Sequence, residues 1–160
     1  MNIIKVDKTN LKAVVELGLL LFPENTFTEL FDVYKKSLAN KNEFLFLYQK
    51  NKLFVGYLHL SVRHDYVNGT DTSPVVFLEA MYVLRDYQQQ GIGKEFVKHA
   101  EQYARQKGIT QLASDCLIEN GLSEAFHKSC GFIEKERVIC FVKDVKCSDD
   151  VADAHGVKLL

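Results

Sequence analysis

The sequence lacks the features that would place it in several well-defined classes of protein. Its formal net charge is -1, so it carries no basic surplus for binding nucleic acids or anionic membranes. No apolar run approaches membrane-spanning length, and residues 2–5 are too short for the apolar core of a signal peptide. Repeats and low-complexity segments are also missing. We therefore expect a protein that acts on neither nucleic acids nor membranes.

The cysteines do not have the spacing of a zinc site or a disulfide framework. We expect no bound metal, and we expect reduced thiols in a cytoplasmic protein, at Cys116, Cys130, Cys140 and Cys147. The length of 160 residues suits one core. We therefore expect a single domain at residues 1–145. The composition turns polar after Val145, so residues 146–160 are interpreted as a C-terminal tail.

Hydrophobic periodicity and turn residues predict alternating strands and helices. Strands are expected at residues 2–6, 44–48, 53–62, 75–84, 111–116, 132–135 and 138–145. Helices are expected at residues 11–21, 28–38, 92–107 and 120–130. The early strands follow one another as hairpins, and the later ones are joined through helices. This order predicts an α/β (α+β) fold, with a mixed central sheet of about seven strands flanked by helices on both faces.

The stretch at residues 75–107 organises the rest of the chain. An apolar strand with one charge, Glu79, leads into a loop containing Gly91 and Gly93, and a long helix follows at once. Helix N-termini offer unpaired N–H groups and partial positive charge, so they bind phosphates. The loop lacks the spacing of a Walker A loop (GxxxxGK[ST]) and the third glycine of a dinucleotide fingerprint (GxGxxG). What fits is Gln88-x-x-Gly91-x-Gly93.

This pattern resembles the pyrophosphate loop of the GNAT (Gcn5-related) N-acetyltransferases, which is written Q/R-x-x-G-x-G/A. Downstream, the second half of the same family's motif is matched by Asn120, Ala125, Phe126, His127, Lys128 and the pair Gly131-Phe132. Within this superfamily, residues 66–74, 77–79 and 113–115 resemble the aminoglycoside 6′-N-acetyltransferases. The resemblance implies the GNAT fold, acetyl-CoA as cofactor and direct acetyl transfer without an acyl-enzyme.

The resemblance also implies which residues hold the cofactor. Backbone amides of the glycine loop would bind the pyrophosphate, and backbone groups of the preceding strand would pair with the pantetheine arm and polarise the thioester carbonyl. The cofactor-binding residues are therefore expected to be Gln89, Gln90, Gly91, Ile92, Gly93, Lys94, Met81, Tyr82, Val83 and Asn120. Asn120 is equally suited to capping the helix that follows it.

The implied acceptor is a cationic aminoglycoside, whose ammonium groups need carboxylates at fixed positions. Residues at family substrate positions are Phe22, Tyr66, Glu79, Asp115 and Glu136. Phe22 stands where some relatives carry a tryptophan. Four of these residues also have a purely structural interpretation: an ion pair for Glu79, a turn or cap for Asp115, a solvated hairpin charge for Glu136 and core cover for Tyr66.

Catalysis requires that the amine lose a proton and that the thiolate gain one. Either Glu79 or Asp115 is a candidate for accepting the first proton, directly or through water. Many family members carry a tyrosine as general acid where this chain has His127, which is able to donate a proton near neutral pH or simply to pack.

The resemblance implies a homodimer formed through C-terminal strands, with residues 138–145 at the interface. Alternatives remain open at this point. One is acetylation of another cationic amine, such as a polyamine or a protein N-terminus. Another is a non-catalytic acyl-CoA sensor, and a third is a dinucleotide-binding module.

Overall fold

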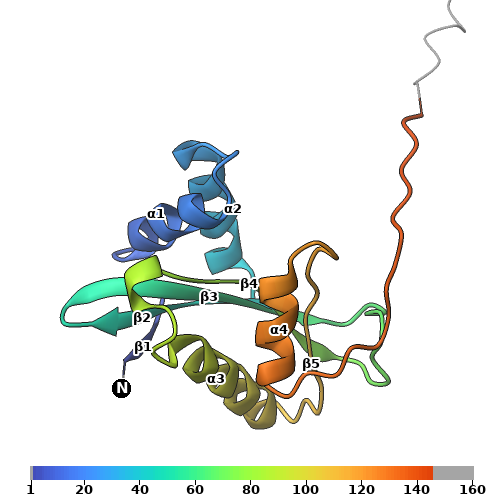
Figure 1. Cartoon of the computed structure of the whole chain (residues 1–160). Helices are drawn as coiled ribbons and strands as arrows, with labels where there is room; N and C mark the ends of the chain where they lie inside the picture. Colours follow the sequence, from blue (N-terminus) through green and yellow to red (C-terminus); the bar gives the residue numbers. More distant parts are fainter. Residues whose placement is uncertain (1, 146–160) are drawn as a thin grey trace, which may run out of the picture.

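The computed structural model describes residues 2–145, which form a twisted mixed sheet with helices on both faces (Figure 1). Its five strands lie in chain order: β1 (Ile3–Lys5), β2 (Glu43–Lys50), β3 (Leu53–Arg63), β4 (Val75–Val83) and β5 (Leu112–Ala113). The first four are antiparallel to their neighbours, and β5 runs parallel to β4. The predicted mixed sheet is thus confirmed, with five strands instead of about seven.

Helices α1 (Leu11–Leu21) and α2 (Phe27–Ala39) cover one face of the sheet. The polar stretch predicted to start the second helix forms a capping box, in which Thr26 and Glu29 each bond the other's backbone N–H. Tyr34 of α2 packs on Tyr57 of β3 in this core. Burial of the apolar helix faces therefore holds α1 and α2 on the sheet.

Helices α3 (Ile92–Gln106) and α4 (Gly121–Ser129) lie on the opposite face, where the fully buried Phe96 of α3 is central to the core. Gly56 of β3 permits the close approach, because a Cβ there would lie 2.7 Å from the Tyr82 carbonyl oxygen and 3.2 Å from the Phe96 ring. None of the helices between residues 2 and 145 is long and apolar enough to cross a lipid bilayer.

The C-terminal part of the described chain differs from the prediction. The strand expected at residues 111–116 is reduced to β5, and the strands expected at 132–135 and 138–145 are irregular backbone. A strand forms only when a neighbour satisfies its backbone N–H and C=O groups, and β5 offers just two paired residues at this end of the sheet. Phe132 still packs against the core and Lys135 lies against Gly69, and beyond them the chain runs away from the body of the protein (Figure 1). The tail predicted at 146–160 lies outside the described residues.

Candidate functional site

The glycine loop presents the uncapped start of α3. A short 3₁₀ turn at Arg85–Tyr87 follows β4, and the Gln88 side-chain amide donates 2.9 Å to the Val83 carbonyl oxygen, so the loop is folded back on the strand. Gly91 adopts a left-handed conformation with φ of 84°, and no side chain of the described residues 2–145 caps the helix. The first-turn N–H groups therefore have no intrahelical partner, which suits an anion.

The loop also leaves space for a large phosphorylated group. A Cβ at Gly91 would meet no atom within 4 Å, whereas a Cβ at Gly93 would lie 2.9 Å from the ring of Phe126 on α4. Gly91 is thus open toward solvent, and Gly93 lets α4 pack close behind the loop. An accessible backbone with unpaired donors fits a pyrophosphate such as that of coenzyme A.

One edge of β4 is free over most of its length. In the described chain β5 pairs only with Val76 and Phe77, and the Ser114 hydroxyl then donates 3.3 Å to the carbonyl oxygen of Leu78. Beyond that point, the outer edge of β4 that includes the predicted cofactor residues Met81, Tyr82 and Val83 has no neighbouring strand among the described residues. Such an edge offers backbone donors and acceptors to an extended ligand.

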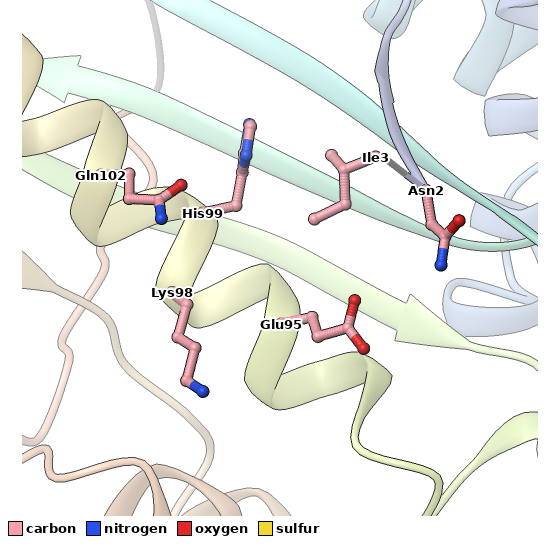
Figure 2. Close-up of a pocket in the computed structure, with 6 residues that line it drawn as sticks. All are labelled: Asn2, Ile3, Glu95, Lys98, His99 and Gln102. Carbon is pink, nitrogen blue, oxygen red and sulfur yellow. The ribbon is translucent and has the colours of Figure 1, made fainter.

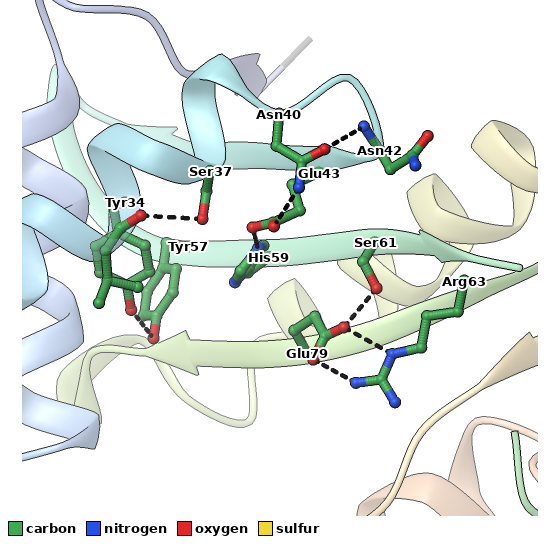
Figure 3. Close-up of polar contacts among 11 residues, drawn as sticks. Tyr34, Ser37, Asn40, Asn42, Glu43, Tyr57, His59, Ser61, Arg63 and Glu79 are labelled. Carbon is green, nitrogen blue, oxygen red and sulfur yellow. Dashed lines mark hydrogen bonds and ion pairs between the residues drawn. The ribbon is translucent and has the colours of Figure 1, made fainter. Parts of the chain in front are cut away.

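Glu79 lies at a β-bulge in β4 that points its carboxylate onto the face of α1 and α2. On β3, His59 faces Ala80 and Leu60 faces Leu78, so Glu79 is an extra residue without a cross-strand partner. Arg63 donates to both carboxylate oxygens, from Nε at 3.0 Å and from Nη2 at 2.7 Å, and the Ser61 hydroxyl donates to Oε1 (Figure 3).

The Glu79 carboxylate lines a polar groove of about 580 Å³, and Tyr66 lines the same groove. Tyr66 is 77% exposed, so its ring and hydroxyl are accessible there. The other lining side chains come from the α2–β2 loop, β2, β3 and the segment after β3: Asn40, Asn42, Glu43, Ser61, Val62, Arg63, His64 and Asp65. Glu79 and Tyr66, predicted to share a site, are therefore brought together.

The remaining predicted acceptor residues lie outside the lining of this groove. Asp115 follows β5, and continuing the β4–β5 register by two residues places it level with Glu79, but it is exposed. Glu136 is exposed in the irregular segment. Phe22 ends α1 and packs against the core beneath that helix. The strand register thus connects Asp115 with Glu79. Glu136 and Phe22 are not brought to either carboxylate.

His127 of α4 is held by hydrogen bonds at both ring nitrogens. Nδ1 lies 2.7 Å from the Ser123 carbonyl oxygen, which accepts only, so Nδ1 carries a proton. Nε2 lies 2.9 Å from the Ser114 hydroxyl, and this bond ties α4 to the point where β4 and β5 separate. His127 is therefore oriented with Nε2 toward the free part of β4.

Asn120 is the N-cap residue of α4. Its side-chain oxygen accepts the Ser123 N–H at 3.1 Å and caps α4. The carboxamide nitrogen is not used by this cap. Asn120 therefore fixes the helix that carries His127, and its amide group is the part that would contact a cofactor.

A second polar pair beside the groove was not among the predicted site residues. His59 Nε2 lies 3.0 Å from Glu43 Oε2, and the Asn40 amide donates 2.7 Å to Oε1 of the same carboxylate (Figure 3). Burial lowers the pKa of His59, and Glu43 offsets this only in part. Burial alone would raise the pKa of Glu43, but bonds from Ser37, His59 and Asn40 outweigh it and lower that pKa.

A usable signal for these residues was present in the sequence. His59, Ser61 and Arg63 alternate along β3, and side chains two apart share one face of a strand. Three polar side chains on the same face of a central strand are costly to bury and so indicate a polar site. Their partners Glu43 and Glu79 depend on strand register, which no short-range pattern specifies.

A second hollow lies between α3 and the start of the chain, on the other face of the sheet. Its volume is about 290 Å³, and Glu95, Lys98, His99 and Gln102 of α3 face Ile3 and Asn2 across it (Figure 2). Its lining shares no residue with the Glu79 groove or with the glycine loop. We therefore do not assign the candidate site to this hollow.

Comparisons with known proteins agree with the geometry of the loop and strand. A family model described as the acetyltransferase (GNAT) family matches residues 11–132. An aminoglycoside N(6′)-acetyltransferase type 1 of Acinetobacter genomosp. 13 is 36% identical over 145 residues, which are 91% of this chain and 99% of that protein.

Solved structures give the same result. The crystal structure of aminoglycoside 6′-N-acetyltransferase AAC(6′)-Ig from Acinetobacter haemolyticus is 34% identical with a TM-score of 0.84, covering 91% of this chain and 100% of that one. AAC(6′)-Iy in complex with the bisubstrate analogue CoA-S-monomethyl-acetylneamine is 34% identical with a TM-score of 0.85, covering 89% and 97% of the two chains.

Proposed function

The chain belongs to the acetyltransferase (GNAT) family, and from this premise we propose that it transfers the acetyl group of acetyl-CoA to the 6′-amine of an aminoglycoside. The observation that carries the proposal is the arrangement of β4. One strand carries both a free edge for an extended acyl donor and, at its bulge, a carboxylate for a cationic acceptor. Such transfer inactivates the antibiotic, so the proposed role is antibiotic resistance. The proposed location is the cytoplasm.

The donor is acetyl-CoA, which supplies an acetyl group activated as a thioester. The first-turn amides of α3 and the loop before it, from Gln89 to Lys94, bind its pyrophosphate. Backbone groups of Met81, Tyr82 and Val83 pair with the pantetheine arm along the free edge of β4. The Asn120 amide adds a side-chain hydrogen bond. An N–H of this strand polarises the thioester carbonyl.

The acceptor is held by its positive charges. Glu79 accepts from an ammonium group in the groove, and Tyr66 forms a wall and hydroxyl contact beside it. Asp115 is the second acceptor carboxylate of the proposal, supported by the β4–β5 register, which if continued beyond Phe77 and Ala113 would bring it level with Glu79. Phe22 and Glu136 are further proposed acceptor contacts on the resemblance alone, since Phe22 packs against the core beneath α1 and Glu136 is exposed outside the groove.

Two protons move during the reaction. The amine attacks only when neutral, so Glu79 or Asp115 takes its proton, directly or through water. His127 replaces the family tyrosine as general acid: its Nδ1–H stays on the Ser123 carbonyl, and the doubly protonated ring gives its Nε2 proton to the Ser114 hydroxyl, which passes its own proton to the leaving thiolate. Direct transfer follows, since every residue invoked binds, orients or moves a proton and none acts as a covalent nucleophile.

We extend the proposal to a homodimer formed through residues 138–145. In a single chain this segment exposes large apolar side chains, including Ile139, Phe141 and Val142, which are 81%, 91% and 96% exposed. Contiguous exposed apolar residues of this kind mark a contact surface. Light scattering on the full chain should give the mass of a dimer, and Phe141→Asp should give that of a monomer.

Thiol release from acetyl-CoA tests the activity, with kanamycin, tobramycin and spermine as parallel acceptors. The proposal requires turnover with kanamycin and tobramycin; absence of turnover with both would refute it, and turnover with spermine alone would favour a polyamine acetyltransferase.

Glu79→Gln and Asp115→Asn should each lower kcat/KM about tenfold or more, since each removes a charge-assisted hydrogen bond. Glu16→Gln on α1 and Asp32→Asn on α2, both exposed, are the matched controls.

A further inference from the structure

The Glu79 carboxylate has most of its hydrogen-bonding capacity already occupied. An ionised carboxylate offers roughly four acceptor positions, two on each oxygen. Oε1 accepts from the Ser61 hydroxyl and from Arg63 Nε, while Oε2 accepts, among residues 2–145, only from Arg63 Nη2. One acceptor position therefore remains, and it lies on Oε2.

The groups that occupy the carboxylate are themselves fixed. The Arg63 guanidinium lies over the ring of Phe77, with Cζ 3.5 Å from the ring centroid, and that ring is buried. Ser61 is a buried residue of the same strand face. A planar fork held between a carboxylate and an aromatic ring loses little further entropy when it forms its bonds. Arg63 and Ser61 thus determine where each Glu79 oxygen points.

We propose that Arg63 and Ser61 are positioning residues that make Glu79 a single-acceptor contact, so that Oε2 receives one N–H of the aminoglycoside. This inference rests on the proposed function. Arg63 itself does not bind the acceptor, because its positive charge repels an ammonium group. Arg63 acts through Glu79 and so affects which amines bind. A rigid sugar scaffold aims its N–H at Oε2, and such an amine is preferred. A flexible amine adapts to any carboxylate position and gains nothing from a fixed one.

A double-mutant cycle tests whether Arg63 acts through Glu79. Calorimetric titration of tobramycin, with coenzyme A present, compares the full-length wild type with Arg63→Gln, Glu79→Gln and the double variant. Each single variant should bind tobramycin about tenfold more weakly, because a charged hydrogen bond is lost or misdirected. The double variant should bind no more weakly than Glu79→Gln alone, within about threefold, because Arg63 then has nothing left to position.

Two further measurements separate positioning from general structural damage. Arg63→Lys keeps the charge without the fork and should not rescue tobramycin binding. Spermine affinity should change by less than about threefold in Arg63→Gln, since a flexible polyamine follows a displaced carboxylate. Should Arg63→Gln lower the thermal midpoint severely, Ser61→Ala replaces it in the same cycle, with the same non-additive result expected.

Three results would overturn the inference. Additive losses in the cycle, about a hundredfold in the double variant, would show that Arg63 acts independently of Glu79. Tighter tobramycin binding by Arg63→Gln would make Arg63 a competitor of the substrate. Equal losses for tobramycin and spermine would remove the selectivity claim. A wild-type chain that neither binds nor acetylates tobramycin would refute the proposed function, and this inference with it, whereas an additive cycle in an active enzyme refutes this inference alone.

Discussion

Removing either hydroxyl of the buried Tyr34–Tyr57 pair should destabilise the protein more than removing both. The Tyr34 hydroxyl donates to the Tyr57 oxygen at 3.0 Å, and the two residues are 2% and 0% exposed. Burial raises the pKa of both phenols, so both remain protonated. Each hydroxyl therefore depends on the other in a site closed to solvent.

The size of the effect follows from that dependence. Tyr→Phe keeps the ring, so each single variant loses little packing but leaves one buried hydroxyl without its partner, at a cost of about 1–3 kcal/mol. In Tyr34→Phe/Tyr57→Phe no buried hydroxyl is stranded, and replacing both partners by apolar groups of the same shape is nearly neutral. A Cβ at Gly18 would lie 2.8 Å from the Tyr34 oxygen, so the pair is tightly enclosed on that side.

Urea unfolding at pH 7 measures the free energies of unfolding of the wild type, the two single variants and the double variant. Far-ultraviolet circular dichroism follows the transition, because the sequence has no tryptophan. We expect the double variant to be more stable than either single variant, with an interaction energy close to the sum of the two single losses, about 2–6 kcal/mol. A double variant whose loss equals the sum of the two single losses would refute the reasoning, because the hydroxyls would then be bonded independently.

Three further outcomes are expected. Burial lowers the pKa of His99 below 6.5, so the unfolded chain binds a proton at a higher pH than the folded chain does. The free energy of unfolding should therefore fall as the pH drops below 6.5. Urea midpoints measured from pH 7.5 to 5 should show this decrease, and His99→Gln should make it smaller. Gly56→Ala should cost about 1–3 kcal/mol by overpacking against the Tyr82 carbonyl, whereas Gly121→Ala, with no atom near its Cβ, should not destabilise; thermal midpoints compare them. Ser114→Ala should lower kcat and alter its pH dependence while leaving tobramycin affinity unchanged, because it removes the contact of His127 Nε2.

The sequence was sufficient to predict the elements whose stability is local or whose apolar pattern is long. Helix α3 was predicted because its apolar positions repeat at helical spacing between a glycine loop and Gly108, and α2 because residues 26–29 cap it. Residues 138–145 carry an equally strong strand pattern, yet they are irregular here. Alternation specifies which side chains would be buried together, but a strand also needs an edge to pair with, and pattern alone cannot supply one.

A residue of the candidate site could be predicted where its immediate neighbours in the sequence made it unusual. Glu79 is the only charge in an apolar strand, and Gly91 precedes a helix, so both were identified from the sequence. Arg63 was missed because its partner is 16 residues away and is met only through strand register. Asp115 and Glu136 were assigned by resemblance, and their positions relative to Glu79 depend on segments that follow the sheet.

The bulge at Glu79 connects the two halves of the proposed reaction. Leu78 faces the core beneath α3, and strict alternation would return Ala80 to that core and turn Met81 away from it. Because Glu79 is an inserted residue, Ala80 instead packs toward α1 and α2, and Met81 and Val83 lie toward α3. A bulge also bends its strand and increases the local twist, and β5 stops pairing two residues before it, at Phe77. The extra residue thus keeps Ala80 on the face of the Glu79 carboxylate, resets the facing of the later residues of β4, and coincides with the opening of the edge that receives the donor. Any change that removed the bulge would shift every later side chain of β4 to the opposite face, so donor and acceptor binding should be lost together.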